Sequence, residues 1–533
     1  MLRGYSIIGG KFQAGDGDIF TGFDPSTGAA LDPPFHYASL EDLNLAADLA
    51  EEAFATYGKL PGREKARFLR HIAAGLDSAA AEVIARAHQE TALPEARLKG
   101  ELARTVNQLR LFAQLVEDGS WVNARIDPAQ PGRKPLPRGD IRSMLRPLGP
   151  IAVFGSSNFP LAFSVAGGDT TSALAGGNPV IVKAHSAHPG TSELVAQVIS
   201  RSVSDCGLPP GVFALLFGAG SKLGGALVEH PHIKGVGFTG SLSAGKSLMD
   251  RAAARPEPIP CFMEMSSVNP VIVLPEALRT RAAQIAGGLF TSFTLGVGQF
   301  CTKPGLVFLP RDSHSDEFIA ELKKLVEPAA ISPMLTEGIS HSYRSGMAQR
   351  RGLSAVETVA EAVAAANCGT TYAVPALLQV DSGDLERHPE LLTEIFGPAT
   401  LVVRFEDRQD LLALLNSLEG QLTATLHGSE SDLADSADLI AALERKAGRL
   451  IVNGFPTGVE VCHAMVHGGP YPATSDSRAT SVGALAIYRF VRPVCFQDFP
   501  DFTLPDELKD SNPLGIWRMV DGSMTRDPIQ PAA

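Results

Sequence analysis

The 533-residue sequence lacks an excess of basic residues, and it lacks a long apolar run. Lysine and arginine number 46 against 58 aspartate and glutamate residues, so the formal charge is −12. Because a protein that neutralises nucleic-acid phosphates needs a basic surplus, this balance excludes nucleic acid as the expected partner. No uncharged apolar run reaches the roughly 18 residues of a membrane helix, and the start of the chain has no apolar signal-peptide core. We therefore expect no membrane span and a cytoplasmic protein.

Cysteine is scarce and scattered. The six cysteines stand singly at positions 206, 261, 301, 368, 462 and 495, with no CxxC motif and no Cys/His metal spacing. This pattern predicts neither a disulfide framework nor a metal site. Each cysteine is by default a small apolar residue, so a reactive one has to be identified by its surroundings.

What the sequence does have is the composition of a large globular protein, and its elements alternate. With 44% apolar and 20% charged residues, the chain predicts two or more domains. Beyond a mainly helical first third, we expect strands at 151–154, 180–183, 212–216 and 233–238, and helices at about 161–175, 194–203 and 223–229. This alternation predicts a doubly wound α/β fold, in which ligands bind at the carboxyl ends of the strands. Strands at 271–274, 306–309 and 401–403 predict a second α/β unit.

Two glycine motifs overlap after the strand at 233–238. Gly235–Gly240 matches the dinucleotide pattern G-x-G-x-x-G, but its first two glycines fall inside the strand. Gly240–Ser247 matches the P-loop pattern G-x-x-x-x-G-K-S, which makes a P-loop NTPase an alternative function. Against it, no strong apolar strand ends in a magnesium-binding aspartate. In either case, a glycine turn that precedes a helix predicts an anion site.

Four short segments occur in the order and spacing of a known family. They are Gly155-Ser156-Ser157-Asn158-Phe159-Pro160, Gly237-Phe238-Thr239-Gly240-Ser241, Gly298-Gln299-Phe300-Cys301 and Glu394-Ile395-Phe396-Gly397-Pro398. Together they resemble the aldehyde dehydrogenase superfamily. The resemblance implies an α/β fold with a doubly wound Rossmann-type dinucleotide-binding domain (1–122 and 148–265) and a second α/β catalytic domain (266–480). It also implies a small β oligomerisation arm with a C-terminal tail (123–147 and 481–533).

The resemblance assigns three catalytic residues. Cys301 is the expected nucleophile, whose thiolate adds to an aldehyde carbonyl to form a thiohemiacetal. The expected oxyanion donors are the Asn158 side chain and the Cys301 backbone N–H. Hydride then leaves for the nicotinamide, and Glu264 is the expected general base that activates water to hydrolyse the thioester. Since Met263 and Met265 flank Glu264, we expect it to be buried with a raised pKa. The commoner family pattern has two glycines shortly after this glutamate, where this chain has Ser266-Ser267.

Cofactor preference is read from the end of the strand at 180–183. Lys183 is placed to meet the adenosine ribose, and Ser186 stands where many NAD-preferring relatives have a glutamate that repels a 2′-phosphate. A hydroxyl carries no charge and can donate to phosphate, so we predict that NADP is preferred and NAD is possible, with Lys183 and Lys222 as cations. The resemblance implies further cofactor contacts at Phe238, Thr239, Gly240, Ser241, Glu394 and Phe396, with Glu394 on the nicotinamide ribose.

The substrate is inferred from a narrower resemblance. Residues 183–190, 300–305, 453–459 and 467–471 resemble the 2,5-dioxovalerate (α-ketoglutarate semialdehyde) dehydrogenase branch, which implies oxidation of that semialdehyde to 2-oxoglutarate. Such a substrate needs a cation, and we expect Arg104 first and Arg478 second, with Phe159 and Phe455 as further contacts. A surface ion pair with Glu101 is the alternative for Arg104.

Two other functions stay open beside this one. The branch borders NADP-dependent long-chain aldehyde dehydrogenases, so a fatty aldehyde is an alternative substrate. A catalytically silent binding protein is the alternative from another class, although Cys301, Glu264 and Asn158 together argue against it.

Assembly is also implied by the resemblance. The arm at 123–147 and a strand expected at 484–490 should form a sheet against another subunit. Since an exposed strand edge invites pairing, we expect a homodimer or homotetramer.

Overall fold

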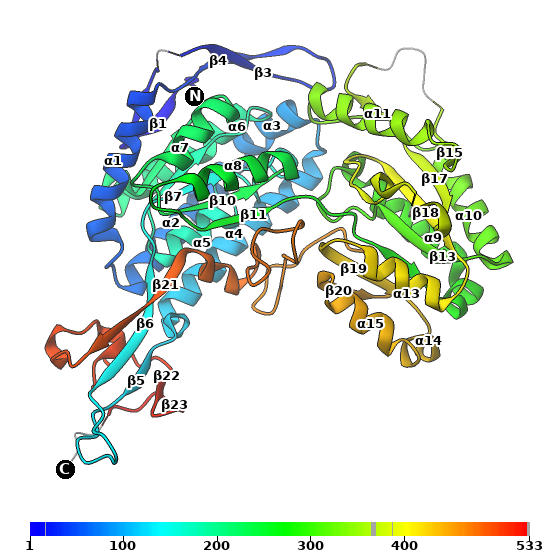
Figure 1. Cartoon of the computed structure of the whole chain (residues 1–533). Helices are drawn as coiled ribbons and strands as arrows, with labels where there is room; N and C mark the ends of the chain where they lie inside the picture. Colours follow the sequence, from blue (N-terminus) through cyan, green and yellow to red (C-terminus); the bar gives the residue numbers. More distant parts are fainter. Residues whose placement is uncertain (16, 364–368, 386, 530–533) are drawn as a thin grey trace.

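The computed structural model describes residues 1–15, 17–363, 369–385 and 387–529. Two seven-stranded sheets, each flanked by helices, occupy the left and right of Figure 1, and a third sheet extends at the lower left. The prediction of an α/β fold is confirmed. Cys368 and the last four residues of the predicted tail lie outside the described residues. Within the described ranges, no helix combines the length and apolar composition that crossing a membrane requires.

The first sheet is the predicted doubly wound sheet. Its order is β11-β10-β7-β8-β9-β1-β2, and the strands from β9 to β11 pair in parallel. The bounds are β1 (Ser6–Ile8), β2 (Lys11–Gln13), β7 (Ile151–Phe154), β8 (Val180–Lys183), β9 (Phe213–Leu216), β10 (Gly235–Thr239) and β11 (Cys261–Glu264). The four strands expected here are all present, because short apolar runs between turns become fully buried parallel strands.

The first helix of the chain begins at a capping box. At the start of α1, the Ser39 hydroxyl accepts from the Asp42 backbone N–H while the Asp42 carboxylate accepts from that of Ser39. The bounds are α1 (Leu40–Tyr57), α2 (Gly62–Ser78), α3 (Ala80–Thr91), α4 (Glu95–Asp118), α5 (Gly168–Gly176), α6 (Pro189–Asp205), α7 (Gly225–Glu229) and α8 (Leu242–Ala254).

The helix expected at about 161–175 is wrong in its first half. The backbone N–H groups of Leu161 and Ala162 donate instead to the Glu101 carboxylate of α4, at 2.8 and 3.0 Å, and α5 begins only at Gly168. Glu101 thus accepts from the first N–H groups of a single turn, in which the Phe163 N–H donates to the Phe159 carbonyl, and the chain does not continue this turn as a helix. The result is a loop, 155–167, at the end of β7.

The second sheet has the order β15-β17-β18-β13-β12-β19-β20. Its strands are β12 (Val271–Val273), β13 (Leu306–Pro310), β15 (Glu357–Glu361), β17 (Ala376–Asp381), β18 (Ala399–Phe405), β19 (Gln421–His427) and β20 (Ala447–Val452). Its helices are α9 (Pro275–Thr294), α10 (Ser313–Val326), α11 (Glu337–Arg351), α12 (Ser382–Leu385), α13 (Arg408–Ser417), α14 (Glu430–Ala434) and α15 (Ala437–Glu444). Two short pairs complete the body: β14 (Ser332–Pro333) with β16 (Tyr372–Ala373), and β3 (Ile19–Phe23) with β4 (Ala30–His36).

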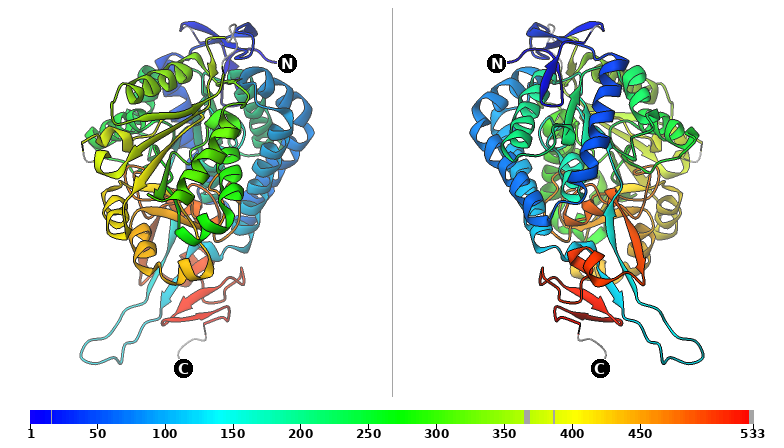
Figure 2. Two further views of the ribbon diagram at one scale, coloured as in Figure 1. Left: turned by 90° about the vertical axis from the view of Figure 1, so that its right-hand side faces the viewer. Right: turned by 90° about the vertical axis from the view of Figure 1, so that its left-hand side faces the viewer.

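The third sheet joins the proline-rich segment to the end of the chain. Its order is β21-β6-β5-β22-β23, with β5 (Arg125–Asp127), β6 (Ile141–Pro147), β21 (Val491–Gln497), β22 (Arg518–Val520) and β23 (Ser523–Thr525). It projects from the body in both views of Figure 2. The strand expected at 484–490 is wrong: these residues form a 3₁₀ helix, Ala484–Phe490, because Ile487 and Phe490 are three residues apart and both fully buried.

Candidate active site

The loop that carries Cys301 follows a 3₁₀ turn, Leu295–Gly298, and glycine makes its course possible. Gly298 has φ +65°, and a Cβ there would lie 2.2 Å from the carbonyl oxygen of Gly397. The Asn269 amide donates to the carbonyl oxygens of Cys301 and Lys303, at 2.8 and 3.0 Å. The loop is therefore fixed on both sides of a partly exposed cysteine.

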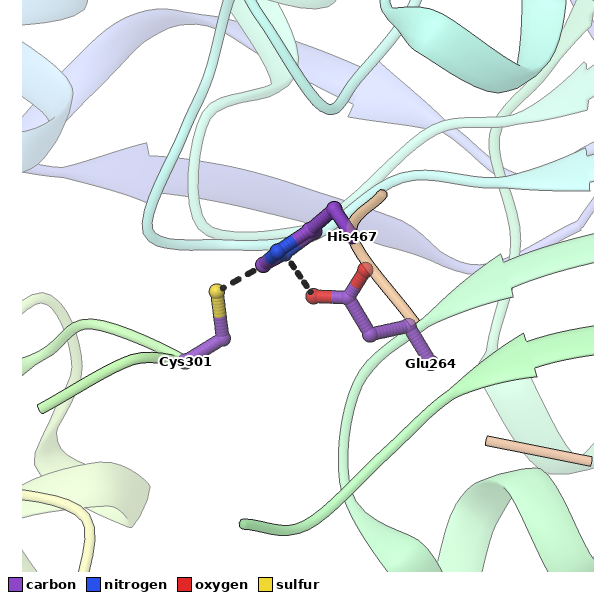
Figure 3. Close-up of side chains that lie close together, drawn as sticks. All are labelled: Glu264, Cys301 and His467. Atoms are coloured by element: carbon purple, nitrogen blue, oxygen red, sulfur yellow. Dashed lines mark hydrogen bonds and ion pairs between the residues drawn. The ribbon is translucent and has the colours of Figure 1, made fainter. Parts of the chain in front are cut away.

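Three side chains from distant parts of the chain meet at this loop (Figure 3). Cys301 Sγ lies 3.6 Å from His467 Nε2, and the same nitrogen lies 3.0 Å from Glu264 Oε1. The other carboxylate oxygen, Oε2, accepts from the Ser481 hydroxyl at 2.6 Å. Glu264 ends β11, so the first sheet brings it to the cysteine.

The pKa values of Glu264 and Cys301 are both shifted. Burial alone would raise the pKa of Glu264, but the neighbouring His467 ring and the hydrogen bonds from His467, Ser481 and Cys301 lower it below its usual value. Burial, followed by the Glu264 charge, raises the pKa of the Cys301 thiol well above 9.0. The expectation of a buried Glu264 is confirmed, whereas the expected raised pKa is wrong, since its hydrogen-bond partners outweigh burial.

Asn158 lies in the loop after β7 and faces the cysteine loop. Its side chain is buried, and Nδ2 donates to the Gln299 carbonyl at 3.0 Å. Its own carbonyl accepts from Arg97 at 2.7 Å. The Asn158 amide thus contacts the cysteine loop at Gln299, two residues before Cys301.

A cavity of about 540 Å³ lies between α4 and the cysteine loop. Its lining includes Arg97 and Arg104 of α4, Val297 and Phe300 of the cysteine loop, and Phe159. The Arg97 guanidinium stacks on Phe159 and Phe300, at 5.0 and 4.8 Å from the ring centroids. Aromatic rings and two guanidinium groups therefore line the cavity, and one of these rings belongs to Phe300, the residue before Cys301.

Arg104 is the cation with hydrogen-bonding capacity to spare. Its Nε donates to the Val459 carbonyl at 3.2 Å, while Nη1 and Nη2 are buried and have no partner among the described residues. Burial lowers the pKa of its guanidinium, opposed by the charges of Glu101, Cys301 and Glu264. The alternative of a surface ion pair with Glu101 is wrong, because Glu101 is buried and accepts from backbone N–H groups instead.

Two expected substrate residues lie outside the lining of this cavity. Phe455 packs on the His427 ring, with centroids 4.8 Å apart, and against Gly288 of α9. Arg478 is exposed and pairs with Asp476, Nη2 to Oδ2 2.8 Å. The structure therefore brings Phe159 and Arg104 to the cavity and leaves Phe455 and Arg478 elsewhere.

The expected cofactor residues gather at the carboxyl edge of the first sheet. Phe154 pairs in register with Lys183 and with Phe238, and Thr239 pairs with Glu264. Lys183 is half-buried, its ammonium has no partner among the described residues, and burial lowers its pKa to about 8. Phe238 is buried, whereas Ser186, Lys222, Gly240 and Ser241 are exposed on the same side of the strands. A free cation at a strand edge beside an exposed helix start fits a dinucleotide phosphate.

Glu394, expected at the nicotinamide ribose, lies just before β18 and next to Phe396. Its Oε2 accepts from the Ser266 hydroxyl at 2.9 Å, and burial raises its pKa, opposed by the charge of Lys303. Ser266, which stands where the commoner family pattern has a glycine, thus donates a hydrogen bond to Glu394, an expected cofactor residue.

Sequence reasoning gave no role to His467 and Ser481. His467 is 166 residues from Cys301, and Ser481 is 217 residues from Glu264, so no spacing rule connects them. His467 stands before Gly468-Gly469, in one of the segments that resemble the 2,5-dioxovalerate dehydrogenase branch. The pairing arises only where that segment folds back onto β11.

In the described ranges, the ligand atoms of Glu264, Cys301 and His467 lie within 4.8 Å of one another, which is close enough to share a metal ion. The hydrogen bonds through one histidine nitrogen account for that closeness. Among the five described cysteines, all are free thiols.

The P-loop alternative fails on geometry. Ser241 caps α8 by accepting from the Ala244 N–H at 3.3 Å, and Lys246 points along the helix to pair with Asp250 at 3.2 Å. An exposed i,i+4 ion pair is a common helix-surface feature. It is not a lysine directed at a phosphate cradle.

A sheet edge that offers a free cation and a helix start for a dinucleotide, and that brings a carboxylate to a cysteine thiol, fits an oxidoreductase. Comparison with known proteins agrees. The model of the aldehyde dehydrogenase family matches residues 12–473, and the chain belongs to this family. It is thus an NAD(P)-dependent enzyme that oxidises aldehydes, which excludes the P-loop NTPase and the silent binding protein.

Individual relatives cover nearly the whole chain. The sequence is 51% identical over 525 residues, 98% of this chain and 99% of the relative, to "Alpha-ketoglutaric semialdehyde dehydrogenase 2" of Azospirillum brasilense. The fold is similar to that of PnpE in complex with nicotinamide adenine dinucleotide, with TM-score 0.79, 20% identity and coverage of 93% and 97%. It is also similar to an NADP-dependent glyceraldehyde-3-phosphate dehydrogenase from Bacillus halodurans complexed with NADP, with TM-score 0.77, 22% identity and coverage of 93% and 99%.

Proposed function

We propose that this enzyme oxidises α-ketoglutaric semialdehyde to 2-oxoglutarate. The observation that carries the proposal is Arg104, a residue of the cavity lining whose two Nη groups are buried and have no partner in the described chain. A planar guanidinium with two free nitrogens matches a carboxylate in a bidentate pair. The relative at 51% identity bears the name of this activity.

The chemistry follows from the residues around Cys301. The thiolate attacks the aldehyde carbon, and the Asn158 amide with the Cys301 backbone N–H donates to the resulting oxyanion. Lys183 and Ser186 at the strand edge would hold NAD(P), which would supply the hydride acceptor. Loss of hydride from the thiohemiacetal leaves a thioester on Cys301. Glu264, already ionised because its pKa is lowered, then takes a proton from the water that hydrolyses the thioester.

The fatty-aldehyde alternative is not favoured by the cavity. An alkyl chain would bury Arg104 without pairing its guanidinium, and an unpaired buried charge is costly. A carboxylate at the far end of a five-carbon substrate would satisfy it.

The test exchanges the cation for an apolar side chain of similar length. We expect Arg104→Met to lower kcat/KM for α-ketoglutaric semialdehyde by about 10²–10³-fold, since pairing with a charged group contributes roughly 2–4 kcal/mol. The same variant should oxidise pentanal, which has the same chain length and no carboxylate, within about threefold of the wild-type rate. Steady-state kinetics with both aldehydes measures the difference.

The matched control is Arg110→Met, which removes an exposed arginine of the same helix that pairs with Asp77. It should leave both substrates unaffected. An equal loss for the semialdehyde and for pentanal in Arg104→Met would remove the carboxylate-binding role.

NADP preference is the second part of the proposal. Ser186 carries no charge where a carboxylate would repel a 2′-phosphate, and Lys183 has a free ammonium at the adjoining strand end. We expect Ser186→Glu to lower kcat/KM with NADP by about 10–100-fold, because two like charges would face each other, and to leave NAD less affected. Cofactor kinetics of Ser186→Gln, similar in size and uncharged, controls for bulk. A wild-type enzyme that strongly prefers NAD would contradict the assignment.

We also infer a homo-oligomer that forms through the third sheet. β21 is an edge strand whose outer side pairs with no strand among the described residues, and Phe499 and Phe502 just beyond it are 49% and 83% exposed. An unpaired edge with neighbouring exposed aromatics favours pairing with a second copy.

A further inference from the structure

One histidine nitrogen lies between the sulfur of Cys301 and the carboxylate of Glu264. His467 Nε2 is 3.6 Å from Sγ and 3.0 Å from Oε1 (Figure 3). The other ring nitrogen, Nδ1, is buried and has no partner among the described residues. The ring is fully buried, and the residue is tied to its neighbours by its backbone N–H, which donates to Thr480 Oγ1 at 2.8 Å.

The proton on this ring can be assigned from its partners. An ionised carboxylate only accepts hydrogen bonds, and Oε2 already accepts from Ser481. Nε2 must therefore donate to Oε1, so the ring carries its proton on Nε2. In this tautomer the only ring N–H, on Nε2, has an acceptor, and Nδ1, partnerless within the described ranges, carries no hydrogen. The N–H that meets the carboxylate is also the one next to the sulfur.

We propose that His467 is a positioning residue for the nucleophile, and that its single Nε2–H, shared between Glu264 Oε1 and Sγ, donates to the Cys301 thiolate. When the thiol ionises, the S–H bond breaks, the proton passes to solvent, the electron pair stays on sulfur, and His467 keeps its own proton. A hydrogen bond to a charged acceptor is about twice as strong as one between neutral groups, so it favours the thiolate over the thiol. The proposal rests on Cys301 as the nucleophile of the proposed function.

Such a donor is needed because the surroundings of the sulfur oppose ionisation. Burial and the charges of Glu264 and Glu394 raise the pKa of Cys301. The charged or titratable groups that face it are Glu264 on β11, Glu394 before β18, Arg104 on α4, Arg449 on β20 and His467 itself. The arginines act at longer range, whereas His467 is within hydrogen-bonding distance of Sγ.

The experiment measures thiol ionisation directly, without aldehyde or cofactor. Iodoacetamide alkylation of Cys301 is followed by mass spectrometry from pH 5 to 10 in the presence of EDTA, so that no metal masks the thiol. We expect His467→Phe to shift the rising limb of the rate profile up by about 1–2 pH units, which slows alkylation at neutral pH by about 10–100-fold. His467→Gln retains an N–H donor and should keep more than half of the wild-type effect.

Controls separate this role from a structural one. His463→Phe changes an exposed histidine four residues earlier and should leave the profile unchanged. His467→Leu replaces His467→Phe if the larger ring lowers the melting temperature. A folded variant without an N–H donor whose rate profile matches that of the wild type would overturn the proposal, as would a shift in His467→Gln equal to that in His467→Phe. Because no substrate is used, a wrong assignment of the semialdehyde would not alter any of these profiles.

Discussion

Replacing Cys301 by alanine is expected to abolish aldehyde oxidation, with kcat reduced by at least about 10⁴-fold. In the proposed mechanism the thiol forms the covalent bond on which both hydride transfer and hydrolysis depend, and removal of a covalent nucleophile costs on that order. The cavity, Asn158 and the cofactor edge remain in the variant, so cofactor binding should persist. Reduced-cofactor formation at 340 nm and fluorescence titration of the cofactor check the two halves of the prediction.

Cys462→Ala provides the matched control. Cys462 is a free, half-buried thiol five residues before His467, on the same segment of chain. Its replacement should change kcat by less than about twofold. Substantial turnover in Cys301→Ala would mean that another group attacks the aldehyde.

Replacing Glu264 by glutamine is expected to separate the two halves of the reaction. Without a carboxylate to take a proton from water, thioester hydrolysis should slow by about 10²–10⁴-fold. Hydride transfer precedes that step, so rapid mixing should show a burst of about one reduced cofactor per active site, followed by slow turnover. Stopped-flow absorbance at 340 nm resolves the two phases, and mass spectrometry of the quenched enzyme should detect the acylated Cys301.

The control for this variant is Glu257→Gln, an exposed carboxylate that pairs with Lys234. It should behave as the wild type. Full steady-state activity in Glu264→Gln would assign the water-activating role to another group, whereas loss of the burst as well would place Glu264 in the first half of the reaction.

The lowered pKa of Glu264 has a consequence for these measurements. Its carboxylate stays ionised below the usual pKa of 4.5, because the contacts with His467 and Ser481 favour the charged form. Around neutral pH the general base is therefore ready in every molecule. It is the ionisation of Cys301, whose pKa is raised, that depends on pH there.

The buried parallel strands of both sheets were predictable because each is a short apolar run between turns, a pattern that permits little else. Elements whose form depends on partners elsewhere in the chain were predicted less well. Residues 161–167 have helix-compatible composition, yet they form only a turn, whose first N–H groups donate to Glu101 of α4, and the α-helix begins at Gly168. Residues 484–490 have strand-like composition but wind into a 3₁₀ helix to bury Ile487 and Phe490.

The local motifs around Cys301, Glu264 and Asn158 were enough to nominate these three as candidate catalytic residues, since each lies in a short segment that carries the family resemblance. The sequence by itself determined the class of fold and the family. Only the tertiary structure decided which side chains surround the sulfur. His467 and Ser481 meet Glu264 across more than 200 residues of chain, and Arg104 lines a cavity with two buried guanidinium nitrogens left unpaired in the described chain. Contacts of this kind depend on how separate elements pack together, and no spacing along one chain encodes them.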